Sequence, residues 1–192
     1  MTSRLSRKGL LAVYLNKVAE QSFSLSVASI SQSIFTSYCF FFLGFAVVLF
    51  VLHYLQVGCT PPVVPALQQL FPEVFQTSNT TLLDKLTAEI PTQIRSFKSR
   101  NTQSLGELLI GFFQYYSTFN WDRTISIRRG DTRPTAMHDK IWRGPYIRLE
   151  DPSDGGNVTR AVFDYYEFTR IKSAFNSATT QLRRNPSLDG IF

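Results

Sequence analysis

The chain has 192 residues, of which 44% are hydrophobic and 18% charged, and this composition excludes a disordered protein and suits one folded domain. Its net charge of +6 fits a polyanionic partner such as RNA or a nucleotide, and ordinary solubility charge explains it equally well. The two cysteines and two histidines show no CxxC pair and no zinc-ligand spacing, which argues against a metal site and favours a reducing compartment.

Residues 1–36 are rich in serine and basic residues and contain a single acid, Glu20. Such a segment loosely resembles a transit peptide. We prefer to interpret it as an irregular or aberrant N-terminal segment with one ragged helix over residues 10–19. The folded part of the chain is therefore expected to begin at residue 37.

Residues 38–55 form a long apolar run, YCFFFLGFAVVLFVLHYL. Its length falls between that of a buried core helix and that of a membrane span. The ends of the run carry no basic cluster, and aromatic and β-branched residues dominate it, which favours a buried helix. A single-pass membrane span over residues 38–55 is the alternative.

Gly58 and the Pro61-Pro62 pair end this run. The apolar residues 63–70 then predict a short helix. Residues 76–103 are rich in Thr, Ser, Gln and Asn with weak periodicity, so we expect a mobile connector with one helix around residues 82–89.

Two amphipathic helices are predicted in the C-terminal half. The first spans residues 104–117, where Ser104 and Glu107 have the spacing of a capping box. The second follows Asp164 and carries its apolar residues on one helical stripe, while its basic residues lie off that stripe and face solvent or a polyanion. The stripe comprises Phe168, Ile171, Phe175, Ala178 and Leu182; the basic residues are Arg170, Lys172, Arg183 and Arg184.

Short strands are predicted between these helices, at residues 124–128 and 146–149, where apolar and polar residues alternate. The second strand leads into an acidic, glycine-rich turn over residues 150–157. The fold class is therefore mainly α with a small β element (α+β).

Catalytic motifs are missing from the sequence. Two-metal nucleotidyl transfer needs carboxylates that converge on paired Mg²⁺ ions, and the chain has no D-x-D pair and no Gly-Ser pair. We therefore predict no catalytic residue and no metal ligand. Asp151 and Asp154 are interpreted first as turn formers and second as acceptors for a base edge. Tyr38 similarly fits a core aromatic better than a residue that stacks on a base.

Three segments together resemble the central and PAP-associated domain of cytoplasmic terminal nucleotidyltransferases, in the germ-line-development class of poly(A) RNA polymerases. The first joins TSYC (36–39), VLHYLQ (51–56) and PPVVPALQ (61–68). The second is SLGELLIGFFQYY (104–116) with FNWD (119–122), and the third is IRLEDP (147–152) with NVTRAV (157–162). Residues 37–185 would then be a partial central plus PAP-associated domain, and residues 186–192 a tail.

The resemblance implies a mostly helical domain that packs against a separate nucleotidyltransferase domain, with the nucleotide between them. Ser37 would contact the triphosphate, Tyr38 would stack on the base, and Asp151, Asp154 and Asn157 would belong to the loop that recognises the base edge. Lys17 and Arg160 would be further triphosphate or RNA contacts. Uridylyl-preferring relatives carry a histidine in this loop, and none lies between Pro152 and Arg160, which favours adenine.

The predicted function is thus the nucleotide-recognition and RNA-facing half of a cytoplasmic poly(A) RNA polymerase. The complete enzyme would use ATP with Mg²⁺ and an RNA 3′ end, possess the nucleotidyltransferase domain missing here, and work with an RNA-binding protein partner. The chain alone is expected to be inactive. The alternatives are a non-catalytic short isoform that binds RNA or protein, and a membrane protein anchored by residues 38–55.

Overall fold

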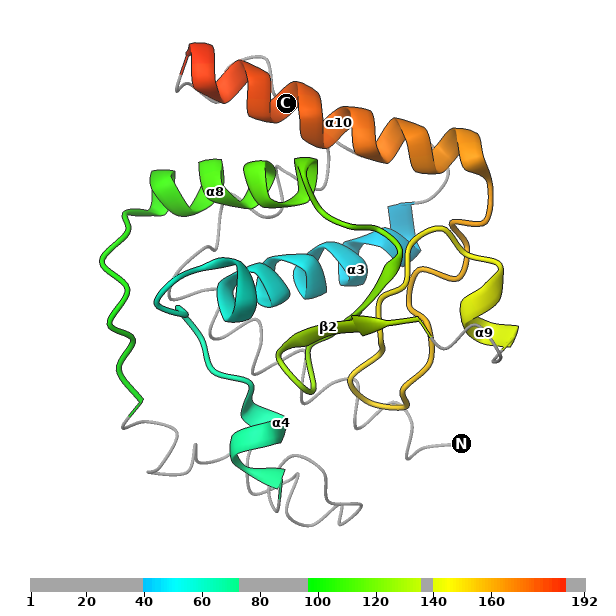
Figure 1. The fold of residues 1–192 in the computed structure, drawn as a ribbon, viewed down its shortest axis with the longest axis horizontal. Helices are drawn as coiled ribbons and strands as arrows, with labels where there is room; N and C mark the ends of the chain where they lie inside the picture. The colour runs from blue at the N-terminus through cyan, green and yellow to red at the C-terminus, as the bar shows by residue number, and fades with distance from the viewer. Residues whose placement is uncertain (1–39, 73–96, 136–139, 186–192) are drawn as a thin grey trace.

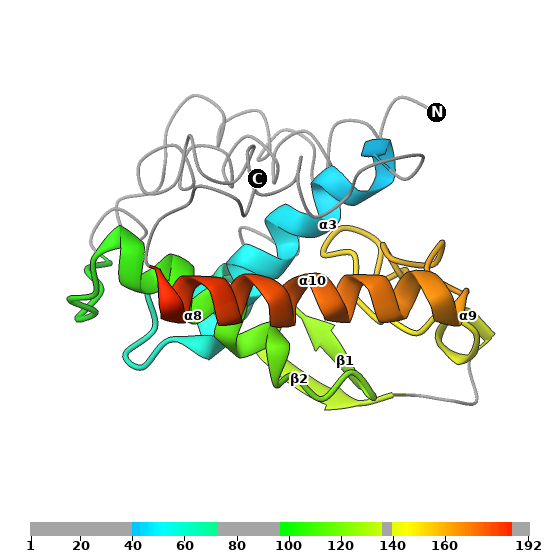
Figure 2. The ribbon, with the colours of Figure 1, turned by 90° about the horizontal axis from the view of Figure 1, so that it is seen from above.

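A computed structural model describes residues 40–72, 97–135 and 140–185 of the chain. In chain order the elements are α3 (Phe40–His53), the π-helix η1 (Tyr54–Gly58), α4 (Leu67–Leu70), α8 (Leu105–Ser117), β1 (Arg123–Ser126), β2 (Asp131–Pro134), α9 (Lys140–Arg143) and α10 (Tyr165–Arg184). Helices α8 and α10 run in opposite directions over α3, and the β1–β2 hairpin lies beside them (Figures 1 and 2). The predicted α+β class is confirmed.

Helix α8 begins where the sequence predicts. The Ser104 hydroxyl accepts from the Glu107 backbone N–H at 3.3 Å, and the Glu107 carboxylate accepts from the Ser104 N–H at 2.7 Å. This reciprocal capping box satisfies two N–H groups that a helix start leaves without partners. Asp164 caps α10 in a related way, because its carboxylate accepts from the backbone N–H groups of Tyr166 and Glu167.

An aromatic cluster forms the centre of the core where α3, α8 and α10 meet. Tyr116 of α8 is almost fully buried and contacts Phe50 of α3 and Phe175 of α10, at ring-centroid distances of 5.1 and 5.3 Å. Every residue of the predicted apolar stripe of α10 is buried, while its four basic residues are exposed. The periodicity of the sequence therefore locates this helix correctly.

The long apolar run is a buried helix within the described residues. From Ala46 to Leu55 almost every side chain of α3 and η1 is buried in the core. No helix among the described residues has both the length and the apolar character needed to cross a membrane. The buried-helix interpretation of this run is therefore confirmed for residues 46–55, and residues 38 and 39 lie outside the described part.

Tyr54 of η1 fills a slot between two glycines. A methyl group on Gly58 would collide with the Tyr54 ring, and one on Gly111 of α8 would collide with the Tyr54 hydroxyl oxygen. The absence of a side chain at Gly111 thus lets α8 approach η1 closely.

Two predicted elements need correction. The expected helix over residues 63–70 is confined to Leu67–Leu70. Upstream of it the N–H groups of Val63 and Val64 both donate to the Leu55 carbonyl, at 2.8 and 3.3 Å, so they hold the chain against η1 outside any helix. The predicted helix over residues 82–89 and most of the connector lie outside the described residues, and residues 97–103 have no regular structure.

The β element also differs from the prediction. The strand expected at residues 124–128 exists as β1, but it pairs antiparallel with β2, which the sequence does not suggest. The prediction of a strand at residues 146–149 was wrong. Within that segment only Leu149 forms a bridge, an isolated parallel one to Ile125, and Glu150 just beyond it forms an isolated antiparallel bridge to Asn157.

Candidate functional site

The acidic turn predicted at residues 150–157 is a closed loop. Glu150 and Asn157 face each other in an antiparallel bridge. Across the loop the Asp151 N–H donates to the Gly156 carbonyl at 2.7 Å, and the Gly155 N–H donates to the Asp151 carbonyl at 2.9 Å. Gly155 has φ +75°, a left-handed conformation that favours glycine. We call residues 150–157 the acidic loop.

Both aspartates of the acidic loop shape its backbone. One Asp151 oxygen accepts from the Ser153 N–H at 2.8 Å and from the Ser153 hydroxyl at 2.5 Å. The Asp154 Oδ1 accepts from the Gly156 N–H at 2.8 Å. These bonds to the backbone two residues ahead are Asx turns, so the turn-forming interpretation is confirmed. Asp151 is buried and Asp154 is exposed, which leaves Asp154 the more accessible carboxylate.

Asn157 holds the loop from inside. Its side chain is 4% exposed, and its Oδ1 accepts from the N–H groups of Leu149 and Thr159 at 3.2 and 3.0 Å. Its Nδ2 donates to the Ile147 carbonyl at 3.3 Å. Both ends of the amide are thus engaged with protein backbone, and Asn157 fixes the two chain segments that enter and leave the loop.

Side chains from distant segments anchor the acidic loop to the rest of the fold. The buried Gln68 of α4 donates from Nε2 to the Pro152 carbonyl at 2.9 Å, across 84 positions of sequence. Arg133 of β2 pairs with Glu150 at 3.4 Å. Sequence reasoning missed both residues, and neither carries a local signal that would have identified it.

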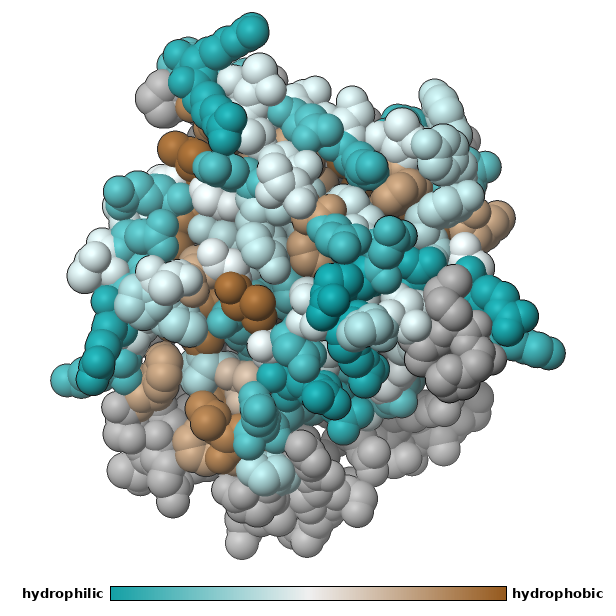
Figure 3. Space-filling view, in the orientation of Figure 1, coloured by the Kyte–Doolittle hydropathy of each residue, from teal (hydrophilic) through white to brown (hydrophobic). Residues whose placement is uncertain are grey.

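Arginines of the hairpin lie beside the loop. The Arg128 Nη1 and the Glu150 Oε1 would each come within 3.8 Å of a methyl group placed on Gly155. Within the described part of the chain the buried Glu150 Oε2 has no hydrogen-bond partner. The face drawn in Figure 3 is largely hydrophilic around this hairpin, and its hydrophobic side chains form small separate patches. The loop therefore faces a polar and charged neighbourhood.

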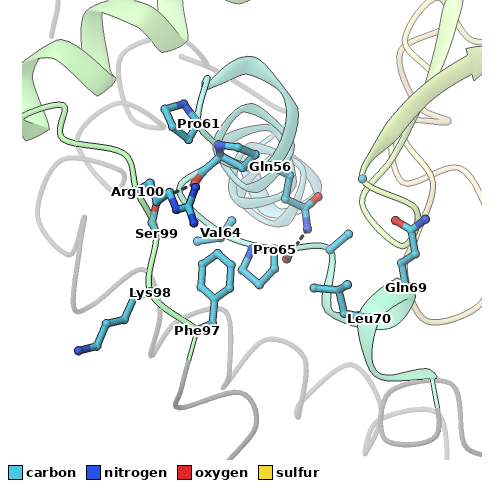
Figure 4. Close-up of a pocket in the computed structure, with 13 residues that line it drawn as sticks. Gln56, Pro61, Val64, Pro65, Gln69, Leu70, Phe97, Lys98, Ser99 and Arg100 are labelled. Atoms are coloured by element: carbon cyan, nitrogen blue, oxygen red, sulfur yellow. Dashed lines mark hydrogen bonds between the residues drawn. The ribbon is translucent and has the colours of Figure 1, made fainter.

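A separate pocket of about 440 Å³ lies between the proline-rich segment after η1 and residues 97–100 (Figure 4). Its walls are mainly apolar, with Val64, Leu70 and Phe97 among them, and Gln56 and Gln69 lie at its edge. Gln56 donates to the Pro65 carbonyl at 3.2 Å, and Ser99 donates to the Pro62 carbonyl at 2.6 Å. None of the described predicted site residues lines this pocket.

The structure brings together only part of the predicted site. Asp151, Asp154 and Asn157 share the acidic loop, and Arg160 follows it as an exposed residue. Ser37, Tyr38 and Lys17 lie outside the described residues. Across residues 40–72, 97–135 and 140–185 there is no group of three His, Cys, Asp or Glu side chains that could hold a metal ion.

Comparison with known proteins identifies the domain that carries this loop. Residues 104–157, from the cap of α8 to the end of the acidic loop, match the family model described as Cid1 family poly A polymerase. Rat poly(A) RNA polymerase GLD2 is 38% identical over 150 residues, and Drosophila melanogaster gld-2 homolog B is 36% identical over 157 residues. The chain contains a PAP-associated domain of the GLD2 class. These alignments cover 77% and 78% of the chain.

Solved structures show the same fold around the PAP-associated domain. The structure of a GLD-2/RNP-8 complex aligns with 97% of this chain and 53% of the other, with 29% identity and a TM-score of 0.58. The Cid1 poly(U) polymerase with bound MgGTP aligns with 76% of this chain and 44% of its own, with 28% identity and a TM-score of 0.56. The chain spans 30% of the rat protein and 11% of the Drosophila protein.

Proposed function

We propose that this chain is the nucleotide-recognition and RNA-facing half of a cytoplasmic poly(A) RNA polymerase that adds AMP from ATP to RNA 3′ ends. The acidic loop is the observation that carries the proposal. It is a rigid, closed turn that presents a carboxylate, and it lies at the end of the segment that matches Cid1-family poly(A) polymerases.

Asp154 is the residue we propose for contact with the base. Only its Oδ1 is used by the Gly156 N–H, and the side chain is exposed, so the second oxygen can accept from an outside donor. Adenine offers such a donor in its exocyclic amino group, whereas uracil offers a carbonyl oxygen at the corresponding position. Asp151, buried and held by Ser153, would support Asp154 by fixing the turn.

The remaining predicted contacts belong to the same proposal. Ser37 would contact the triphosphate, Tyr38 would stack on the base, and Lys17 and Arg160 would neutralise phosphates of ATP or RNA. Asn157 would act indirectly, because its amide bonds to the backbone that frames the loop.

Magnesium does not fit the residues that the structure describes. The sequence has no D-x-D pair, and the described residues offer no ligand cluster for a metal. We therefore propose that Mg²⁺ enters the complete enzyme with ATP and is held by carboxylates of a nucleotidyltransferase domain. The chain alone would recognise the nucleotide without transferring it. The solved complex of a related GLD-2 with RNP-8 supports a protein partner as well.

A chimera tests this function. The matching 150 residues of rat GLD2 are replaced by this chain's residues, and an RNA primer is incubated with ATP or UTP and Mg²⁺. We expect the chimera to extend the primer with AMP, and the isolated chain to extend nothing. A folded chimera that transfers no nucleotide, or prefers UTP, would contradict the proposal.

A further inference from the structure

Three aromatic residues close together in sequence, at and just before the start of α10, are exposed. Phe163 is 71% exposed, Tyr165 is 66% exposed and Tyr166 is 69% exposed. They precede the apolar stripe of the helix, which starts at Phe168 and packs toward α8. They therefore lie outside the buried face of α10. We call these three residues the aromatic surface. Large exposed apolar patches on protein surfaces mark interaction sites, and three exposed aromatic residues within four positions make this segment a candidate for one.

The Tyr165 ring packs on other aromatic rings of the fold. Tyr165 contacts the edge of Tyr146 at 5.6 Å, and Tyr146 stacks on Phe168 at 5.2 Å with an angle of 12° between the rings. Because Phe168 is buried in the core, this stack ties Tyr165 of the aromatic surface to the core of the fold. A flat ring held in place loses little conformational entropy when another flat group stacks on it.

Positive charges accompany the rings. The Arg170 guanidinium lies 5.9 Å from the Tyr166 ring centre, and the Lys172 ammonium lies 5.2 Å from the Phe168 ring centre. Both acids of the region are engaged locally: the Asp164 carboxylate caps α10, and Glu167 pairs with Arg170 at 3.3 Å. Further along α10 the exposed Arg183 and Arg184 add positive charge.

We infer that the aromatic surface binds single-stranded RNA. Bases would stack on Tyr165 and Tyr166, and the backbone phosphates would lie against Arg170 and Lys172. Stacking rings interleaved with cations are how proteins bind single strands without reading their sequence. An apolar protein partner would have to bury these cations, and an acidic peptide would satisfy the charges but leave the ring faces unused.

The position of the aromatic surface suits this role. The start of α10 and residues 140–164 lie at the same end of the molecule (Figures 1 and 2). The Tyr146 N–H donates to the Val162 carbonyl at 2.8 Å, which fixes the segment that leads from the acidic loop to α10. The inference rests on the proposed function: an RNA whose 3′ end lies near the acidic loop would have its upstream nucleotides pass the aromatic surface.

Fluorescence anisotropy with the full chain tests the inference. The probe is a labelled, unstructured RNA of about 12 nucleotides, within the usual site size of single-strand binders. We expect the Tyr165→Ser/Tyr166→Ser variant to lose about tenfold or more in affinity, and Tyr165→Phe/Tyr166→Phe to stay within about twofold of the wild type. Leu105→Ser, at another exposed apolar side chain, is the matched control and should bind as the wild type does.

Two further measurements sharpen the test. Arg170→Gln/Lys172→Gln should lower the slope of log affinity against log salt by about 1 to 2. A double-stranded RNA of the same length should bind more weakly, because its bases are not free to stack. Unchanged RNA binding by the serine variant would overturn the inference and leave the surface to a protein partner. Absence of RNA binding by the wild type would overturn it too, while the ATP-dependent activity of the chimera would still decide the proposed function separately.

Discussion

The hydroxyl of Tyr116 lies 2.9 Å from His53 Nδ1 and donates its own proton to the Phe50 carbonyl at 2.9 Å. His53 must therefore be the donor in the contact between them, so the neutral ring carries its proton on Nδ1. Its Nε2 is buried and has no hydrogen-bond partner in the described part of the chain. The pair links α3 to α8 in the middle of the core.

This arrangement predicts a stability that depends on pH. Burial lowers the pKa of His53 from 6.5 to about 4. The unfolded chain then binds a proton between these values and the folded chain does not, so stability is complete above pH 6.5 and falls as the pH drops toward 4. The loss should be roughly 3 kcal/mol at most, at 1.36 kcal/mol per pKa unit. The neighbouring tyrosines do not titrate in this pH range, because burial raises the pKa of Tyr115 to about 12 and the pKa of Tyr116 well above its usual value.

Urea unfolding at several pH values measures this dependence. In His53→Phe the slope between pH 4 and pH 6.5 should flatten, even though the variant loses the bond to Tyr116 and is less stable at neutral pH. An undiminished slope in the variant would assign the acid sensitivity to other groups.

The close contact of α8 with Tyr54 predicts opposite effects of one substitution at two positions of the same helix. Gly111→Ala should destabilise the domain by about 1–3 kcal/mol, because the new methyl group collides with the Tyr54 hydroxyl. Gly106→Ala meets nothing within 4 Å and should be neutral or stabilise by up to about 1 kcal/mol, through its better helix propensity. Thermal unfolding of the two variants checks the pair, and equal effects would mean that the slot for Tyr54 is not tight.

The buried side-chain amide of Asn157 bonds to backbone groups, so its removal should lower the stability of the domain markedly. Asn157→Ala leaves the buried N–H groups of Leu149 and Thr159 without this acceptor, so it should cost about 2–4 kcal/mol. Asn176→Ala, at an exposed position of α10, should change stability by less than about 0.5 kcal/mol. If both substitutions cost equally little in denaturant unfolding, Asn157 does not hold the acidic loop.

The helices could be predicted from sequence because their signals are local. The capping-box spacing of Ser104 and Glu107 predicts the start of α8, and the apolar stripe from Phe168 to Leu182 predicts the buried face of α10. Strand β2, with the sequence DTRP, has no alternation to reveal it, since it exists only through pairing with β1. Apolar and polar residues do alternate over residues 146–149, but of these residues only Leu149 forms a β-bridge, with Ile125.

The site could be predicted in part for the same reason. The turn formers Asp151, Asp154 and Gly155 act over two or three positions, so their pattern is visible in the sequence. Gln68 supports the loop through a carbonyl 84 positions away, and nothing near it in the sequence indicates that partner. The roles of Ser37 and Tyr38 came from family resemblance and stay predictions.

The most direct test of base recognition by the acidic loop is the ratio of ATP to UTP incorporation by the chimera with rat GLD2, measured for the wild-type loop and for Asp154→Asn. The amide can offer a donor to uracil and accepts more weakly from adenine, so the ratio should fall by about tenfold. Asp122→Asn, at an exposed aspartate outside the loop, should leave the ratio unchanged. An unchanged ratio in Asp154→Asn would contradict the assignment of base recognition to this carboxylate.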